Sequence, residues 1–225
     1  MFEAKTNMPG PVRMKPNVFE KMGPSKEVGY FVKFTVAVFG DSGVGKSSII
    51  RQLVGEGFTE QHIPTVEDFY VKQMTHRNKA YEFDVIDTSG TYEFPAMRRV
   101  AIQKANAAVL VYSVDKPESF TKLERYMEEV KSCCDDSNRT IPVMIVSNKA
   151  DLPKLTEPTF FNQRGLQISA CDYVESKWKC KWLATSAKFN LNVVALFRKI
   201  LDTLCPEKKT LPRSGSIIWQ KLHAC

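Results

Sequence analysis

The eight residues from Gly40 to Ser47 have the types and the spacing of a loop that binds phosphate. The segment reads Gly-Asp-Ser-Gly-Val-Gly-Lys-Ser. Glycines let the backbone curl so that its N–H groups point at phosphate oxygens, while Lys46 reaches the β and γ phosphates and the Ser47 hydroxyl ligates Mg²⁺. We therefore expect the chain to bind a nucleoside phosphate through this loop and the next residue. The expected contacts are Gly40, Asp41, Ser42, Gly43, Val44, Gly45, Lys46, Ser47 and Ser48.

Asp87 and Gly90 stand where a second contact to phosphate and metal is expected. They follow the apolar-alternating run 81–86, so the carboxylate comes at the end of a predicted strand. From there it can hold Mg²⁺ through the water shell of the metal, and Gly90 can offer its N–H to a γ-phosphate. Alone, an aspartate followed by a glycine three residues later is a common turn. Together with the phosphate loop, the motif indicates a contact to metal and phosphate rather than a plain turn.

The segment 148–151, Asn-Lys-Ala-Asp, follows another apolar run and fits a loop that reads guanine. The Asp151 carboxylate can accept from guanine N1–H and from its exocyclic amino group, and adenine lacks this donor pair. Asn148 would tie the loop to the base and to the phosphate loop. The Lys149 stem would cover the ring.

A further segment, Ser186-Ala187-Lys188, follows the last predicted strand and precedes the last predicted helix. A backbone N–H near Ala187 would meet the guanine carbonyl oxygen. An ordinary helix-capping Ser186 is the alternative at this point.

Alternating strands and helices position these motifs. Apolar runs predict strands at 31–39, 67–75, 80–87, 107–114, 141–147 and 180–185. Helical periodicity predicts helices at 46–55, 95–104, 117–131, 160–176 and 191–204. This alternation predicts an α/β fold: a doubly wound, mainly parallel six-stranded sheet with helices on both faces. Only 67–87 reads as an antiparallel hairpin, which would lie at the edge of the sheet.

The predicted domain occupies residues 30–204. Residues 1–29 contain four prolines and three glycines without apolar periodicity, and we expect a flexible extension there. Residues 205–225 are predicted to form a polar tail with one apolar patch at 217–219.

Composition excludes several classes of protein. A hydrophobic content of 43% and a charged content of 25% are ordinary for a globular chain, and no run approaches the roughly 20 apolar residues of a membrane span. The six cysteines have no metal-binding spacing, so we expect reduced thiols in the cytosol. The net charge of +7 is scattered, which argues against nucleic acid as a partner and leaves weak attraction to an anionic membrane.

In their order and spacing, the four motifs resemble those of the Ras superfamily of small GTPases, over about residues 31–204. Pro64–Tyr70 is similar to the effector segment of the Ras branch, and 94–99 looks most like the Di-Ras and Rhes-like subgroup. The resemblance implies binding of GTP or GDP with Mg²⁺. It also implies effector proteins that bind Pro64–Tyr70, an exchange factor and a GTPase-activating protein.

The resemblance also assigns roles to residues whose types alone do not reveal them. Thr65 would complete the coordination of Mg²⁺ with Ser47 and Asp87, and Phe58 would pack on the guanine. By the same resemblance, contacts of Thr65 and Gly90 with the γ-phosphate would hold the loops 58–67 and 90–99 in an effector-binding shape until hydrolysis releases them.

Four features depart from the Ras pattern. Thr91 stands where Ras-family members usually carry the glutamine that orients the attacking water, so the catalytic set Lys46, Gly90 and Thr91 predicts slow hydrolysis. Ser42 adds bulk where an arginine finger would enter. The segment 152–183 is longer than its Ras counterpart, and Pro158, Phe160, Phe161, Trp178 and Trp182 within it have no assigned role. Its aromatic residues are expected to be buried or to pack as a lid. The end, Leu-His-Ala-Cys, is not a prenylation box.

Three functions remain open at this stage. The leading hypothesis is a GTP/GDP switch that hydrolyses GTP slowly, located in the cytoplasm with weak or transient contact at the plasma membrane. The second is a nucleotide-binding scaffold without measurable hydrolysis, which Thr91 favours. The third is a P-loop kinase or adenine ATPase, against which Asp151 and Lys188 argue.

Overall fold

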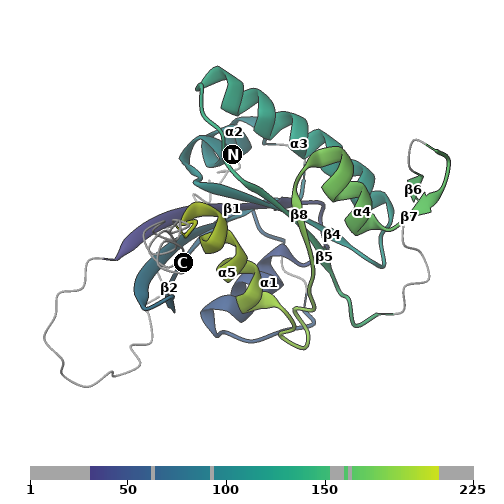
Figure 1. Cartoon of the computed structure of the whole chain (residues 1–225). Helices are drawn as coiled ribbons and strands as arrows, with labels where there is room; N and C mark the ends of the chain where they lie inside the picture. The colour runs from purple at the N-terminus through teal and green to yellow at the C-terminus, as the bar shows by residue number, and fades with distance from the viewer. Residues whose placement is uncertain (1–30, 62–63, 92–93, 153–159, 162–163, 208–225) are drawn as a thin grey trace, which may run out of the picture.

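The computed structural model describes residues 31–61, 64–91, 94–152, 160–161 and 164–207. Its centre is a six-stranded sheet in the order β2-β3-β1-β4-β5-β8 (Figure 1). The strands are β1 (Val32–Gly40), β2 (Glu67–His76), β3 (Lys79–Thr88), β4 (Ala107–Ser113), β5 (Val143–Asn148) and β8 (Lys181–Ala184). All neighbours pair in parallel except β2 and β3, which form the antiparallel hairpin at the edge. The predicted mixed, mainly parallel sheet is confirmed.

Helices cover both faces of this sheet. They are α1 (Lys46–Val54), α2 (Pro95–Lys104), α3 (Glu118–Asp136), α4 (Ala170–Tyr173) with the π-helical turn η1 (Val174–Trp178), and α5 (Val193–Leu204). Figure 1 shows α2 and α3 on one face and α1 and α5 on the other. The helices and the sheet enclose two apolar cores, one on each face of the sheet. Every residue of β4 is buried, because this strand lies between both cores.

The parallel strands bring the chemistry-bearing segments together at one end of the sheet, where the carboxyl ends of the strands lie. Strand β1 ends at Gly40, β3 at Thr88, β5 at Asn148 and β8 at Ala184. The four predicted motifs begin at or next to these four strand ends. In doubly wound sheets, ligands bind beyond the carboxyl ends of the strands, so the fold places all four motifs where a ligand is expected.

The helix predicted at 160–176 is wrong in its first half. Short strands β6 (Phe160–Phe161) and β7 (Gln167–Ile168) pair there in a separate antiparallel hairpin, which Figure 1 places beside the main sheet. Gly165 adopts a φ of 74°, a left-handed conformation that interrupts a helix. The helix begins only at Ala170, where the Ser169 side chain accepts a hydrogen bond from the N–H of Asp172.

Aromatic residues of the long segment 152–183 pack against α3. The rings of Trp178 and Phe120 stack with centroids 5.2 Å apart, and Phe160 stacks on Tyr173 at 4.2 Å. Trp182 packs with the same core and donates its indole N–H to the hydroxyl of Tyr112 at 3.1 Å. The expected packing is therefore confirmed for Phe160, Trp178 and Trp182.

Two other residues of this segment have different outcomes. The side chain of Phe161 is 62% exposed, so packing of this residue is not observed. Phe161 directly follows Phe160 in β6, and successive side chains of a strand point to opposite faces, so only one of the two reaches the core. Pro158 lies outside the described residues.

Both expected extensions fall wholly or mostly outside the described residues, which begin at Phe31 and end at Glu207. In the part of the chain that the structure describes, no helix combines the length and the apolar character needed to cross a membrane. The five cysteines within it, Cys133, Cys134, Cys171, Cys180 and Cys205, are free thiols.

Candidate functional site

A cavity of about 330 Å³ opens beyond the carboxyl ends of the strands. The predicted site residues that line it are Ser42, Gly43, Gly45, Lys46, Ser47, Ser48, Phe58, Thr65, Gly90, Thr91 and Lys149. The other predicted residues, Gly40, Asp41, Val44, Asp87, Asn148, Asp151, Ser186, Ala187 and Lys188, do not line this cavity. A second cavity of about 430 Å³, between the C-terminal half of α3 and the starts of β4 and β5, contains none of the predicted site residues.

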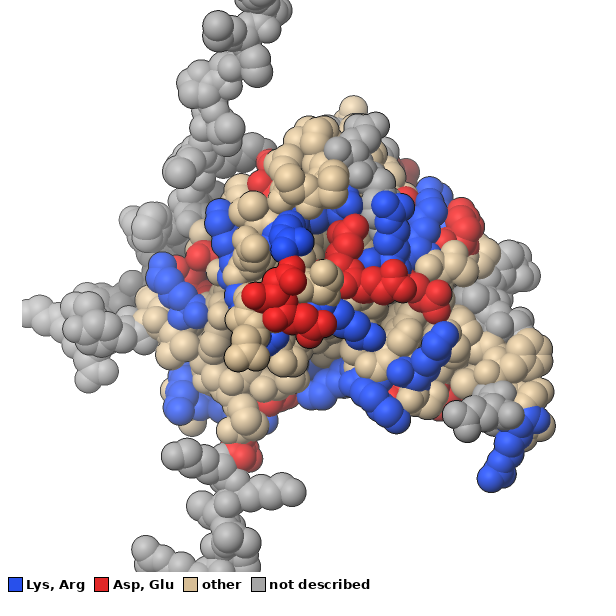
Figure 2. All heavy atoms as spheres, turned by 90° about the horizontal axis from the view of Figure 1, so that it is seen from above, with Lys and Arg blue, Asp and Glu red and all other residues tan. Residues whose placement is uncertain are grey.

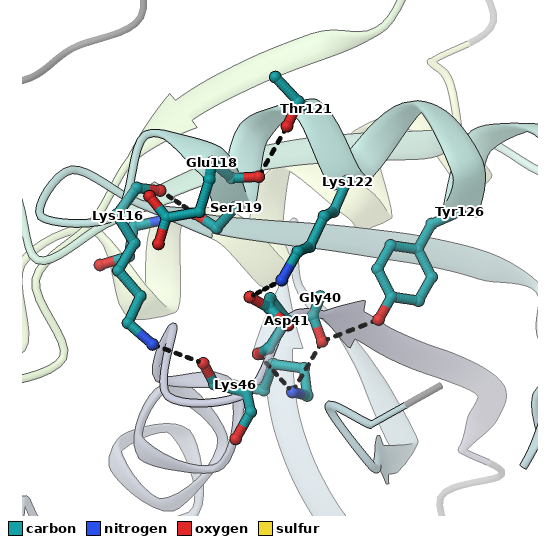
Figure 3. A network of polar contacts seen from close by, with 11 residues as sticks. Gly40, Asp41, Lys46, Lys116, Glu118, Ser119, Thr121, Lys122 and Tyr126 are labelled. Atoms are coloured by element: carbon teal, nitrogen blue, oxygen red, sulfur yellow. Dashed lines mark hydrogen bonds and ion pairs between the residues drawn. The ribbon is translucent and has the colours of Figure 1, made fainter. Parts of the chain in front are cut away.

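Lys46 is held in place by the loop that it belongs to. Its ammonium donates to the carbonyl oxygens of Gly40 at 3.0 Å and Asp41 at 3.1 Å (Figure 3). Only 6% of the residue is exposed. Burial lowers the pKa of Lys46 to about 8, although the carboxylates of Asp87 and Asp41 oppose this shift. An anion in the adjoining cavity would stabilise the charged ammonium.

The outer side of the phosphate loop is fixed by α3 and the residues before it. The Tyr126 hydroxyl donates to the Gly40 carbonyl at 3.2 Å, and Lys122 pairs with the Asp41 carboxylate at 2.7 Å (Figure 3). These contacts were not predicted from the sequence. The available signal was the spacing, because residues four apart on a helix share one face.

Asp87 is the residue with the clearest need for a bound cation. It is fully buried, and neither carboxylate oxygen has a hydrogen-bond partner among the described residues. Burial raises the pKa of Asp87, and the nearby Ser47 hydroxyl and Lys46 ammonium lower it only in part. The hydroxyls of Ser47 and Thr65 lie 3.0 Å apart. Mg²⁺ prefers hard oxygen ligands, and a carboxylate with two hydroxyls fits this preference.

Gly90 lies directly against the phosphate loop. A Cβ atom at this position would come within 2.5 Å of the backbone of Ser42, so no side chain fits. The next residue, Thr91, lines the cavity, but its hydroxyl lies 3.0 Å from the Ser89 hydroxyl and pairs with it. The Thr91 carbonyl accepts from Arg98 at 3.4 Å. Arg98 is in turn held by two hydrogen bonds to the Glu129 carboxylate, at 2.8 and 3.0 Å.

Asn148 connects three of the four motifs. Its amide nitrogen donates to the Val44 carbonyl at 2.9 Å, in the phosphate loop. Its amide oxygen accepts from the Thr185 hydroxyl at 3.1 Å and from the N–H of Ala187 at 3.2 Å. The N–H of Ala187, expected to meet the guanine, is therefore engaged with Asn148. A Cβ at Gly45 would meet the Asn148 amide at 2.3 Å, which leaves room only for glycine.

Side-chain contacts orient the remaining residues of the base-reading loops. The Ser186 hydroxyl donates to the Asp151 carboxylate at 2.5 Å. Lys149 has a positive φ of 61°, and its ammonium pairs with Asp115 at 2.9 Å. Phe58 lines the cavity and is 38% exposed.

Comparison with known proteins gives consistent results. The Ras family model matches residues 35–205. The GTP-binding protein Di-Ras2 of Mus musculus is 38% identical over 169 residues, which cover 75% of this chain and 80% of that protein. The GTP-binding protein Di-Ras1 of Homo sapiens is 36% identical over 171 residues, with the same coverage. The GTP-binding protein Rhes of Homo sapiens is 35% identical over 170 residues, or 73% of this chain and 62% of that protein.

Proposed function

The chain belongs to the Ras family, and from this premise we propose that it works as a GTP/GDP-dependent signalling switch with slow intrinsic hydrolysis of GTP. It is a small GTPase, as the family model and the relatives show. The observation that carries the proposal is the buried, unpartnered Asp87 carboxylate beside Lys46 and the Ser47–Thr65 hydroxyl pair. This arrangement matches what Mg²⁺ and a polyphosphate require. We assign the function to a GTPase domain at residues 30–204.

Within this proposal, each group has one task. The backbone of residues 40–48 and the Lys46 ammonium bind the phosphates, and Ser47, Thr65 and Asp87 hold Mg²⁺, which neutralises phosphate charge when bound. Asp151 selects guanine by accepting its donor pair. Asp151 is oriented for this task because the Ser186 hydroxyl donates to it.

The switch would work through two loops at the rim of the cavity. Thr65 and Gly90 each contribute to the lining, one from the loop before β2 and one from the loop after β3. Contacts of both with a γ-phosphate would order these loops, and loss of that phosphate would release them. Effector proteins would then bind Pro64–Tyr70 only in the GTP state. Val66 and Phe69 in this segment are 62% and 64% exposed, which leaves apolar surface for a partner.

Slow hydrolysis follows from two residues of the site. Thr91 has a short side chain whose hydroxyl is already paired with Ser89, so it orients an attacking water poorly. Ser42 adds a side chain to the phosphate loop and would blunt the approach of an arginine finger. Because intrinsic hydrolysis would be slow, partner proteins would set the lifetime of each state: an exchange factor, and a GTPase-activating protein only where Ser42 does not obstruct it. A scaffold that binds nucleotide without hydrolysis is the second candidate, and Thr91 is the observation that favours it.

The site of action would be the cytoplasm, with weak or transient contact at the plasma membrane. The face seen in Figure 2 carries acidic side chains among the basic ones, so no continuous basic patch covers it. On this face, the distribution does not form the basic stripe that a nucleic acid would need. The basic residues at 208, 209, 213 and 221 lie outside the described residues and would each add about 1 kcal/mol of attraction to an anionic surface.

Nucleotide identification tests the proposed function directly. Purified protein is denatured, and the released nucleotide is separated by ion-exchange chromatography. We expect GDP or GTP at close to one molecule per chain, and we expect unlabelled GTP, but not ATP, to displace a fluorescent guanine nucleotide. Release of an adenine nucleotide, or displacement by ATP and GTP alike, would contradict the proposal. Single-turnover hydrolysis then separates the slow GTPase from the scaffold.

A further inference from the structure

The second cavity, of about 430 Å³, lies at the end of the sheet opposite to the nucleotide cavity. Ala107, Val143 and Lys181 line it, and these residues begin the strands β4, β5 and β8. Because the three strands are parallel, their first residues lie at one end of the sheet and their carboxyl ends at the other. Further walls come from α3 on one face of the sheet and α5 on the other (Figure 1). The proposed function leaves this cavity without a role.

Apolar side chains form the interior of the second cavity. They come from α3, from β5 and the loop before it, from η1 and from α5, and are Met127, Val130, Ile141, Met144, Trp178 and Ile200. All of them except the half-buried Trp178 are buried, so the cavity reaches the apolar core. A cavity of roughly 300–1,000 Å³ with an apolar lining is typical of a site for a small molecule. The apolar part of such a ligand would be removed from water here.

The mouth of the second cavity is basic. Lys131, Lys179 and Lys181 line the cavity and are exposed, so they lie where it meets solvent, and we call these three residues the cationic rim. Arg139 adds a fourth positive charge to the lining. Asp135 is the only carboxylate among the described residues that line the cavity. The charge at the mouth therefore favours an anion.

The ammonium groups of the cationic rim are not neutralised by the protein. Among the described residues, no carboxylate lies within ion-pair distance of these three lysines. The Lys181 ammonium donates to the neutral hydroxyl of Thr203 at 2.9 Å, and Thr203 also lines the cavity. Burial raises the pKa of the Cys180 thiol in the cavity wall, and the charge of Lys131 lowers it in part. Positive charge thus reaches the cavity from two elements, α3 and β8.

The C-terminal residues of this chain do not match the cationic rim in charge. They follow α5, whose last turns contribute Ile200 and Thr203 to the cavity. Residues 208–225 contain basic side chains at 208, 209, 213 and 221 and no acidic side chain. Like charges repel, so a separate, anionic molecule fits the cavity better than this segment.

We propose that the second cavity binds a single-chain aliphatic carboxylate, with the chain in the apolar interior and the carboxylate between Lys131 and Lys181. The carboxylate supplies the partner that these ammonium groups lack, and the interior removes the chain from water. The inference does not rest on the proposed function, because none of the predicted nucleotide-site residues lines this cavity.

Calorimetric titration of decanoate into the purified full chain tests this inference. Decanoate and 1-decanol have the same chain length, but only decanoate is charged, and both are used at concentrations where they do not aggregate. We expect one decanoate per chain, and binding of 1-decanol weaker by at least about fivefold. The double variant Lys131→Gln and Lys181→Gln should weaken decanoate binding by about fivefold, as for partly exposed charge pairs, and leave 1-decanol binding unchanged.

Two single variants separate the effect of space from the effect of charge. Thr203→Phe places a ring in the cavity from an exposed position of α5, and it should abolish binding of both ligands. Lys79→Gln is the matched control, because it removes the same charge at the start of β3, outside the cavity. We expect it to leave both dissociation constants unchanged.

The inference fails if decanoate and 1-decanol bind equally well, or if the double variant binds decanoate as tightly as the wild type. Absence of decanoate binding to the wild type would also overturn it. Binding of phosphatidylserine vesicles or of an acidic peptide in place of decanoate would then assign the cationic rim to a membrane surface or to a protein. Failure to bind a guanine nucleotide would overturn the proposed function alone, because the decanoate titration does not depend on the nucleotide.

Discussion

Asp87 is a charged residue that the folded protein buries without compensation by any described hydrogen bond. A buried, unpartnered carboxylate destabilises the fold, and a bound cation would reverse this effect. We therefore expect Asp87→Asn to leave the unfolding midpoint of nucleotide-free protein unchanged or higher. The same variant should lose most of the thermal stabilisation that Mg²⁺ adds to the GDP-bound protein.

Differential scanning fluorimetry with GDP, in the presence of Mg²⁺ or EDTA, measures both effects. Asp84→Asn is a suitable control, since it changes a carboxylate on the same strand β3 that is not among the predicted metal ligands. An Asp87→Asn protein that keeps the full Mg²⁺-dependent stabilisation would remove Asp87 from the metal site.

Thr91 decides how fast the proposed switch turns itself off. Because its hydroxyl pairs with Ser89 at 3.0 Å, we expect intrinsic hydrolysis at or below the order of Ras itself, about 3–5 × 10⁻⁴ s⁻¹. Thr91→Gln should accelerate single-turnover hydrolysis, since glutamine can both donate to and accept from the attacking water. Thr91→Ser should change the rate little. A basal rate well above the Ras order, or equal rates in wild type and Thr91→Gln, would show that Thr91 is not the cause.

Asp151 carries the choice of base. Its carboxylate already accepts from Ser186, which fixes its orientation toward a guanine. Asp151→Asn presents a donor where guanine also presents donors, so GTP binding should weaken by about 1.5–3 kcal/mol or more. Xanthosine nucleotides, whose base edge offers an acceptor, should bind the variant better than the wild type. Competition titrations with GTP and XTP measure this change, and equal GTP affinity in both proteins would contradict the assignment.

At the scale of elements, the sequence was sufficient to predict a helix or strand where its apolar pattern extended over many residues. All six sheet strands come from the predicted apolar runs, helices α1, α2, α3 and α5 come from sustained helical periodicity, and the structure confirms all of them within about five residues. The segment 160–176 was mistaken because its apolar residues fit a helical pattern, whereas Gly165 forces a turn and each strand of the hairpin has only two residues. A pair of such short strands has too little periodicity to recognise.

The candidate site was also predictable only in part: the sequence indicates the residues expected to contact a ligand, but not the residues that support the phosphate loop. Motifs identify residues that contact a ligand, because ligand chemistry restricts their types and spacing. The contacts of Lys116, Lys122 and Tyr126 with the phosphate loop have no such restriction. Any donor of the right length on that side of α3, or in the segment just before it, would suffice, so only the three-dimensional arrangement reveals them.

The aromatic contact between η1 and α3 anchors the long segment that departs from the Ras pattern. Trp178 stacks on Phe120 with an interplanar angle of 8° and also contacts Tyr173. We expect Trp178→Ala to lower the free energy of unfolding by about 2–4 kcal/mol, because it removes a large, half-buried ring. Phe161→Ala, at an exposed position, should cost under about 0.5 kcal/mol.

Urea unfolding of the GDP-bound protein, followed by circular dichroism, compares these two variants. Guanine-nucleotide affinity should stay unchanged in Trp178→Ala, because η1 contributes no residue to the nucleotide cavity. Equal stability of the two variants would show that the aromatic cluster does not anchor the segment.

For the whole molecule, the two buried charges make stability depend on the ligand. Lys46 begins α1, after the loop that follows β1, and Asp87 lies near the end of the adjacent strand β3. Burial disfavours the charged form of each. Phosphate restores a partner to the ammonium, and Mg²⁺ restores one to the carboxylate. A protein that binds such ligands in the folded state alone is stabilised in proportion to the logarithm of ligand concentration. The fold is therefore expected to be weakest when the site is empty.

This coupling predicts a pH dependence that belongs to nucleotide-free protein. The pKa of Lys46 is about 8 in the folded state, against 10.5 for an ordinary lysine. Between these values the unfolded chain binds more protons than the folded one, so the free energy of unfolding should rise with pH, by at most about 1.4 kcal/mol per unit. Below the lower value both states are protonated and this contribution is flat.

Asp87 acts in the opposite direction at acidic pH. Its pKa is raised in the folded state, so the folded chain binds more protons in the window above the ordinary aspartate value, and stability falls as pH rises through that window.

Urea unfolding of nucleotide-free wild type and Lys46→Met between pH 8 and 10 isolates the lysine contribution. The difference in unfolding free energy, wild type minus variant, should rise with pH, because the ammonium that is costly to bury loses its proton. Parallel curves for the two proteins would show that the buried position of Lys46 does not shift its pKa.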